Sequence, residues 1–171
     1  MLILGIESSC DDCSLAVVED GRRIVAHTVA SQVELHRPYD GVVPELASRA
    51  HTELILPTYR ETLKRAGLEP GDLGGVAVTS RPGLSGSLVV GVSFAKALAY
   101  GLNIPLIGID HILAHLYAPQ LAQPIEYPFL GVLVSGGHTI ICKVNDFDDI
   151  EVMGTTIDDA WLQIINPDHW L

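Results

Sequence analysis

Two histidines four positions apart, His111 and His115 in the run HILAH, could bind a metal ion. Side chains at positions i and i+4 of a helix lie on one face, where two neutral imidazoles can ligate one divalent cation. HILAH has no glutamate between its histidines, so it lacks the general base of the metalloprotease motif H-E-x-x-H. A metal also needs at least a third ligand. Taken alone, such a pair more often packs or caps than ligates.

The run SGGHT, which begins at Ser135, could bind an anion. Gly136 and Gly137 admit backbone conformations that other residues avoid, so their N–H groups could face a phosphate together. Ser135 and His138 would add hydrogen-bond donors. An ordinary hairpin turn explains the same residues equally well, and both interpretations stay open here.

The polar run ESSCDD, residues 7–12, joins two apolar stretches and places Ser9 and Asp11 in an elbow. An acidic side chain there could orient a metal or a water near phosphates, although solvated turn acids are as common. Cys10 and Cys13 form a C-x-x-C, but a second such pair, which a structural zinc site would need, is absent from the sequence. We expect both thiols to be incidental.

Two other runs carry polar residues beside predicted helices. SRPGLSGS, residues 80–87, could offer N–H groups to phosphate, but it matches neither nucleotide-binding glycine motif. A tight connection that packs closely through Gly83 and Gly86 is the favoured interpretation. PELASRAH places Glu45 and His51 on a helix, where Glu45 is a possible cleft residue and a solvated helix face is the simpler expectation.

Apolar periodicity predicts the elements that must position these residues. Strands are predicted at residues 2–6, 13–19, 22–31, 74–80, 105–109, 129–135, 140–146 and 149–157. Helices are predicted at residues 44–66, 88–103 and 111–118. Pro57 should kink or split the first helix, and Gly67 should end it. Strands first and then alternating helices and strands indicate an α/β protein, and two strand–elbow–strand units are typical of actin-like folds.

Composition limits the possible classes of function. The chain has 171 residues, of which 48 % are hydrophobic and 18 % charged, so it can bury a core and should not be disordered. Its net charge of −11 argues against a domain that binds RNA through its own electrostatic attraction for the phosphates. Glu7 precedes any basic region, which argues against a secretory signal, and the apolar runs are interrupted. We therefore expect a cytoplasmic location and no membrane association.

The combination of runs is more specific than any one of them. GIESSCDD, GVVPELASRAH, VTSRPGLSGSLVVGVSFAKALA, PLIGIDHILAH, LVSGGHT and TTIDDA occur in order over residues 1 to about 160. In this the chain resembles the tRNA N6-adenosine threonylcarbamoyltransferase family (TsaD/Gcp/OSGEP, formerly called O-sialoglycoprotein endopeptidase). The resemblance implies the two-lobed actin-like ATPase (ASKHA) fold. It also implies transfer of threonylcarbamoyl from threonylcarbamoyl-AMP to N6 of adenosine 37 (t6A) in tRNAs that read codons beginning with A.

The resemblance also implies ligands and partners. His111 and His115 would hold an iron or zinc ion. Threonylcarbamoyl-AMP or another adenine nucleotide would contact Val134, Ser135, Gly136, Gly137 and His138. In bacteria the enzyme would act on tRNA together with a smaller, inactive TsaB-like paralogue and a TsaE-like P-loop ATPase.

The sequence departs from the family pattern in three places. Cys13 replaces a usual Thr, Arg81 replaces a common Gly, and after IDDA the chain reads WLQIINPDHWL instead of Gly-Glu-Ala-Phe-Asp-Lys. We therefore expect a first actin-like lobe at residues 1–125, an incomplete start of a second lobe at 126–160 and an aberrant tail at 161–171. An aspartate, the third metal ligand, would be missing. The chain alone should then be inactive; the alternatives are a non-catalytic docking module for the paralogue and, least favoured, a metallo-endopeptidase.

Overall fold

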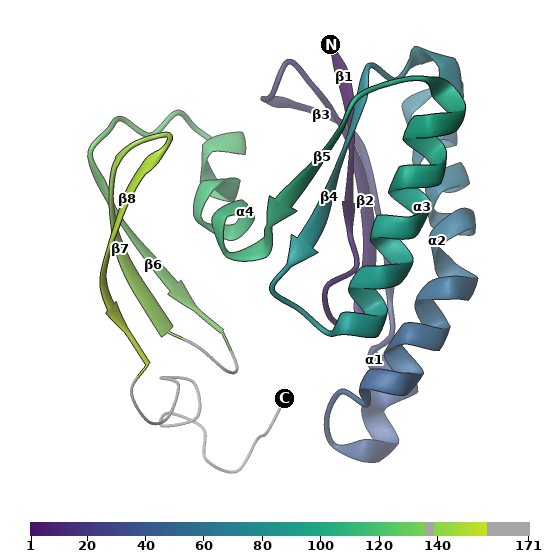
Figure 1. Ribbon diagram of the computed structural model, residues 1–171, viewed down its shortest axis with the longest axis horizontal. Coiled ribbons are helices and arrows are strands. Elements are labelled where there is room, and N and C mark those ends of the chain that lie inside the picture. Colours follow the sequence, from purple (N-terminus) through teal and green to yellow (C-terminus); the bar gives the residue numbers. More distant parts are fainter. Residues whose placement is uncertain (136–138, 157–171) are drawn as a thin grey trace. The chain divides into compact units, whose positions relative to one another are not determined.

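The computed structural model describes residues 1–135 and 139–156, which form two compact units, Met1–His111 and the residues from Ile112 onward (Figure 1). The first unit holds a five-stranded sheet, and the second a three-stranded sheet. We predicted a boundary after residue 125. The second unit begins earlier because Leu116, on the segment that follows His111, is buried with Cys142 and Val144 of the second sheet.

The strands and helices follow the predicted order. The strands are β1 (Leu2–Glu7), β2 (Asp12–Glu19), β3 (Arg23–Ser31), β4 (Gly75–Arg81), β5 (Leu106–Asp110), β6 (Phe129–Val134), β7 (Thr139–Asp146) and β8 (Asp149–Thr155). The helices are α1 (Val33–His36), α2 (Pro44–Ala66), α3 (Ser85–Leu102) and α4 (His111–Tyr117). Short 3₁₀ turns are η1 (Arg37–Tyr39), η2 (Pro70–Asp72) and η3 (Ala118–Leu121).

The first sheet mixes antiparallel and parallel pairs. β1 pairs antiparallel with β2, and β2 with β3, as expected for strands joined by short connections. On its other side β1 pairs parallel with β4, and β4 pairs parallel with β5. Parallel strands place their carboxyl ends at one edge of a sheet, where open α/β sheets bind ligands. Glu7, Arg81 and Asp110 end these three strands, so this edge gathers the polar residues that follow them.

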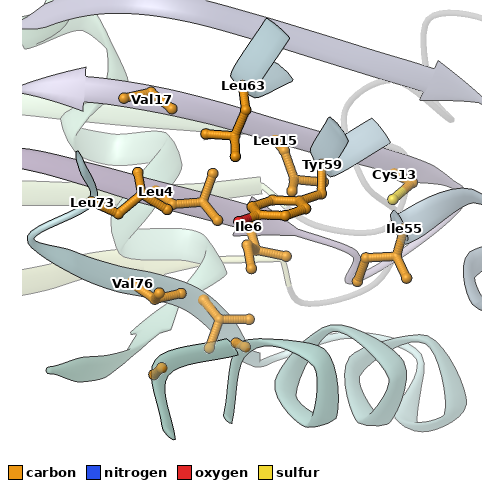
Figure 2. Close-up of a cluster of buried hydrophobic side chains, with 13 residues drawn as sticks. Leu4, Ile6, Cys13, Leu15, Val17, Ile55, Tyr59, Leu63, Leu73 and Val76 are labelled. Carbon is orange, nitrogen blue, oxygen red and sulfur yellow. The ribbon is translucent and has the colours of Figure 1, made fainter. Parts of the chain in front are cut away.

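The core of the first unit lies between this sheet and the two long helices, α2 and α3 (Figure 2). Alternate residues of β2 point into it, since Cys13, Leu15 and Val17 are all nearly inaccessible to solvent. Tyr59 of α2 packs edge-on against Phe94 of α3, with ring centroids 5.5 Å apart. This core fixes both helices against the sheet and hence the loops at its carboxyl edge.

We predicted that Pro57 would kink or split helix α2; the helix continues from Pro44 to Ala66, so Pro57 does not split it. Proline removes one backbone hydrogen bond. The residues on both sides of Pro57 compensate, because Ile55 and Tyr59 are buried in the core and Thr58 donates its hydroxyl to the Leu54 carbonyl at 2.7 Å. Gly67 ends the helix in a left-handed conformation (φ 67°), as predicted.

Helix α3 begins at Ser85, three positions before its predicted start, because the Ser-Gly-Ser of the preceding loop forms its first turn. Of the helices in the described residues, it is the one that is long and apolar enough to cross a membrane. Its buried residues recur at every fourth position, at Ser87, Gly91, Ala95 and Ala99. Ala95 and Ala99 belong to the core beside the sheet, as expected for a core helix of an α/β protein.

Candidate functional site

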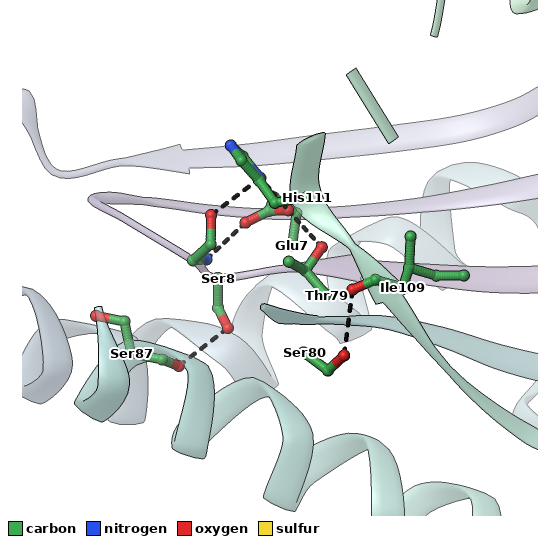
Figure 3. A network of polar contacts seen from close by, with 8 residues as sticks. Glu7, Ser8, Thr79, Ser80, Ser87, Ile109 and His111 are labelled. Carbon is green, nitrogen blue, oxygen red and sulfur yellow. Dashed lines mark hydrogen bonds and ion pairs between the residues drawn. The ribbon is translucent and has the colours of Figure 1, made fainter. Parts of the chain in front are cut away.

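Glu7, at the carboxyl end of β1, is the centre of a polar cluster (Figure 3). Its carboxylate accepts hydrogen bonds from the backbone N–H of Ser9 and the hydroxyl of Thr79 on β4. The same carboxylate lies 3.1 Å from Nδ1 of His111, the first residue of α4. Three elements distant in sequence thus meet at one half-buried carboxylate.

The surroundings of Glu7 favour its ionised form. Burial by itself would raise the pKa of this carboxyl, but hydrogen bonds from Ser9, Thr79 and His111 together hold the pKa below its usual value. A carboxylate is an acceptor only, so its contact with His111 requires a hydrogen on Nδ1. In a neutral imidazole this contact favours the tautomer with the hydrogen on Nδ1.

Ser9 and its neighbour Ser8 are held by residues just before α3 and in its first turn. Ser9 is 3 % exposed, and its Oγ lies 3.1 Å from Nδ1 of His111. The Ser9 carbonyl accepts from the N–H of Leu84 at 2.8 Å. Ser8 donates its hydroxyl to the carbonyl of Ser87 at 3.0 Å. The elbow is consequently held by two residues of the glycine-rich run, Leu84 and Ser87.

The glycines of that loop and helix are needed for close packing. A Cβ on Gly83 would lie 2.6 Å from the Ser9 carbonyl oxygen, and one on Gly86 would lie 2.2 Å from Oγ of Ser48. A Cβ on Gly91 would lie 2.2 Å from Oγ of Ser8. The interpretation of SRPGLSGS as a tightly packed connection is confirmed.

His51 supports the elbow from α2. It is fully buried, and its Nε2 lies 3.0 Å from the carbonyl oxygen of Cys10. The expectation of a solvated face was thus wrong for His51, because this side of α2 faces the elbow. The expectation of a solvated face is confirmed for Glu45. Its side chain is 74 % exposed and forms an ion pair with Arg49, one turn along α2. The role of Glu45 in a cleft stays a prediction.

The cysteines of the elbow are poorly suited to nucleophilic or redox chemistry. Burial raises the pKa of the Cys13 thiol to about 11. Partial enclosure, together with the neighbouring Asp11, raises the pKa of Cys10 to about 11 as well, although Cys10 lies at the surface. Reactive cysteines have lowered pKa values. Both thiols therefore fit the expectation that they are incidental.

The two histidines of HILAH lie on α4 at positions i and i+4, so helix geometry places them one turn apart. The side chain of His111 is 27 % exposed, and His115 lies at the surface. With Nδ1 of His111 facing Glu7, Nε2 is the nitrogen suited to a metal. The i, i+4 spacing is compatible with two ligands of a divalent cation. Within residues 1–135 and 139–156, no group of three or more His, Cys, Asp or Glu residues could hold a metal ion.

The predicted substrate loop is only partly described. Val134 ends β6, and Ser135 follows it. Gly136, Gly137 and His138 lie outside the described residues. Asp11 is half-buried in the elbow between β1 and β2. The roles of these residues as ligand contacts stay predictions.

Glu7 and Thr79 are the two members of the polar cluster that we did not predict as site residues. Both lie in strands whose apolar residues predicted a buried core strand and not a site. The signal that could have found them is their position, since each lies at or near the carboxyl end of a strand in a parallel pair. Their convergence on His111 is visible only in three dimensions.

Comparison with known proteins points to one family. Residues 23–166 match the family model described as TsaD, tRNA N6-adenosine threonylcarbamoyltransferase. A protein of that name from Treponema denticola is 61 % identical over 160 residues, which cover 94 % of this chain and 47 % of the relative. One from Borrelia hermsii is 56 % identical over 160 residues, with the same coverage. The chain thus spans about half the length of the curated relatives it matches.

Solved structures agree on the fold. YeaZ from Pseudomonas aeruginosa superposes with a TM-score of 0.56 at 19 % identity, over 90 % of this chain and 66 % of that one. Component A of the (R)-2-hydroxyglutaryl-CoA dehydratase of Acidaminococcus fermentans superposes with a TM-score of 0.51 at 13 % identity, over 93 % and 48 %. At such identities the likeness concerns the fold alone, and it confirms the predicted α/β fold of the actin-like ATPase class.

Proposed function

Because this chain belongs to the tRNA N6-adenosine threonylcarbamoyltransferase family, we propose that it takes part in transferring threonylcarbamoyl from threonylcarbamoyl-AMP to N6 of adenosine 37 in tRNA. The observation that carries the proposal is the pairing of His111 with the Glu7 carboxylate at the carboxyl edge of the sheet. This contact supports the proposed metal site, because a hydrogen on Nδ1 of a neutral His111 would leave Nε2 to bind the ion. The relatives of that name are 51 to 61 % identical to the chain.

The reaction joins two atoms and releases AMP. The lone pair of adenosine N6 attacks the carbamoyl carbon, a carbon–nitrogen bond forms, and the bond from that carbon to the phosphate oxygen breaks. AMP leaves with the bonding electrons, and N6 loses one proton. Donors that hold the phosphate and the carbonyl oxygen where charge develops would accelerate this step.

The residues of this chain would bind and orient the reactants. His111 and His115 would hold an iron or zinc ion, which when bound supplies Lewis-acid polarisation of substrate oxygens. Val134, Ser135 and the Gly-Gly-His that follows would contact the adenylate. Ser9 and Asp11 of the elbow would be further contacts of a bound ligand, with the Ser9 carbonyl held by the N–H of Leu84. The described residues supply two of the metal ligands, so little transferase activity is expected of the chain alone.

Binding of the adenylate is the direct test. Equilibrium dialysis of the chain against radiolabelled threonylcarbamoyl-AMP should show saturable binding that AMP competes for weakly. His138→Ala should weaken it, whereas the exposed His27→Ala on β3 should leave it unchanged. If the wild-type chain retained no adenylate above the level of an unrelated protein, the proposal would be wrong. Transfer to tRNA by the chain alone at the rate of a full-length relative would contradict the expected low activity.

Partners would supply the contact with RNA. A chain of net charge −11 attracts polyanions poorly, so we propose that the TsaB-like paralogue and the TsaE-like ATPase complete the tRNA surface in the cytoplasm. A docking role that does not involve catalysis is the alternative. Size-exclusion chromatography of the chain with the paralogue tests both. Co-elution with transfer activity supports the enzyme, co-elution without it supports the docking module, and separate elution removes the docking role.

A further inference from the structure

We propose that Glu7 is a positioning residue that holds His111 in its Nδ1–H tautomer and directs Nε2 toward the metal. This inference rests on the proposed metal site and adds a residue to it. Metal-binding histidines usually donate their second ring nitrogen to a carboxylate or carbonyl group, which fixes the ring and raises its basicity. In this chain the candidate acceptor, Oε2 of Glu7, is 3.1 Å from Nδ1.

The carboxylate of Glu7 is itself held in place. Ser9 donates its backbone N–H to Oε1, and Thr79 donates its hydroxyl to Oε2 (Figure 3). Glu7 lies on β1, the central strand of the sheet, with β2 on one side and β4 on the other. A side chain fixed by two donors on rigid elements loses little further freedom when it binds a third group. Glu7 can therefore impose an orientation on His111.

The tautomer of His111 follows from the acceptors around Nδ1. Oε2 of Glu7 and Oγ of Ser9 both lie 3.1 Å from this nitrogen. The Ser9 hydroxyl can donate or accept, but an ionised carboxylate can only accept. An unprotonated Nδ1 would place its lone pair against that of the carboxylate. In the neutral ring the hydrogen is therefore on Nδ1, which leaves the lone pair on Nε2.

Glu7 is also distinct from the other acids of the elbow. Asp12 begins β2, is exposed, and carries a second carboxylate of the same elbow. Asp12→Asn removes one negative charge near the elbow, as Glu7→Gln does. A comparison of the two variants separates hydrogen bonding to His111 from a general change in local charge.

The first measurement needs no metal. In the chain labelled with ¹⁵N, the imidazole nitrogen shifts of His111 should report a hydrogen on Nδ1. Glu7→Ala should convert His111 to a mixture of tautomers, and Asp12→Asn should leave the wild-type signal. Glu7→Gln keeps an acceptor oxygen and the size of the side chain, so its tautomer ratio should lie between those of the wild type and Glu7→Ala. This variant keeps the test possible if Glu7→Ala does not fold. The amide spectrum shows which variants are folded.

The second measurement uses Zn²⁺ alone as the probe. Titration of the chain with Zn²⁺ should perturb His111 and His115, and the apparent affinity should fall about 10- to 100-fold in Glu7→Ala, less in Glu7→Gln and not in Asp12→Asn. If Zn²⁺ perturbs neither histidine in the wild type, the metal site itself is wrong. If Zn²⁺ binds equally well to wild type and both folded Glu7 variants, or the tautomer does not change, the role assigned to Glu7 is wrong while the metal site stands.

Discussion

The Oε2 atom of Glu7 lies 3.1 Å from Nδ1 of His111, although 104 positions separate the two residues in the chain. The contact joins the end of the first strand to the start of the helix that carries HILAH. It relates the ESSCDD and HILAH runs, which the sequence presents as separate features. The same carboxyl edge of the sheet also receives Thr79, so the cluster arises from the strand order β1-β4-β5.

Gly91→Ala is expected to destabilise the protein even though alanine is the better helix former. A Cβ at Gly91 would lie 2.2 Å from Oγ of Ser8, whose hydroxyl is bonded to the Ser87 carbonyl. Overpacking of this kind costs about 1–3 kcal/mol, against about 1 kcal/mol gained in helix propensity. Urea unfolding followed by circular dichroism measures the difference.

Gly101→Ala in the same helix is the matched control. Nothing lies within 4 Å of a Cβ at Gly101, so this change should be neutral or stabilise by up to about 1 kcal/mol. Ser8→Gly combined with Gly91→Ala should recover part of the loss. Equal effects of Gly91→Ala and Gly101→Ala on the free energy of unfolding would show that Ser8 does not limit the packing.

His51→Leu should destabilise the elbow more than His51→Gln. Leucine has a suitable size but leaves the Cys10 carbonyl without the donor now 3.0 Å away, at a cost of about 1–3 kcal/mol. The amide nitrogen of glutamine can reach nearly the position of Nε2 and replace that donor. Thermal unfolding of both variants checks the order. A more stable leucine variant would mean that the hydrogen bond contributes little.

The thiols of Cys10 and Cys13 should react slowly at neutral pH. A pKa of about 11 leaves about one thiol in a thousand ionised at pH 8, against about one in ten for a pKa of 9.0. Alkylation by iodoacetamide should therefore be about a hundredfold slower than for an ordinary cysteine and should rise roughly tenfold per pH unit up to pH 10.

The same labelling separates the two cysteines. Cys10 is exposed and should be labelled in the native chain, whereas Cys13 is fully buried and should be labelled mainly after unfolding. Mass spectrometry of peptides assigns each modification. Rapid labelling of either cysteine at pH 7 would reveal an activated thiol and would revive a chemical role for the C-x-x-C.

Leu116→Ala should loosen the second unit more than Leu113→Ala on the same helix. Leu116 is 8 % exposed and forms a small core with Cys142 and Val144, whereas Leu113 is 40 % exposed. Removal of the buried side chain costs about 2–5 kcal/mol, and removal of the more exposed one costs less. Hydrogen exchange of β7 amides should accelerate strongly in Leu116→Ala alone. Similar exchange in both variants would show that α4 does not depend on this core.

The local structure could be predicted from the sequence to a large extent. All eight strands and the three longer predicted helices occur where apolar periodicity indicates them, and Gly67 ends α2 as expected. Glycine-rich packing before α3 was also foreseeable, since Gly83 and Gly86 allow backbones to approach closely. The strands, the helices and their ends depend mainly on residues close to one another in the chain. A short stretch of sequence is therefore enough to predict them.

The sequence by itself determined that His111 and His115 lie one helical turn apart, because that spacing is a property of the helix. Only the tertiary structure decided that Glu7 faces His111 and that His51 is buried beneath the elbow. It also decided that α2 continues through Pro57, because burial of the adjoining residues offsets one lost hydrogen bond. Such contacts depend on which strands pair and which helix faces are covered, and the parallel pairing of β1 with β4 brings together residues that no local pattern relates.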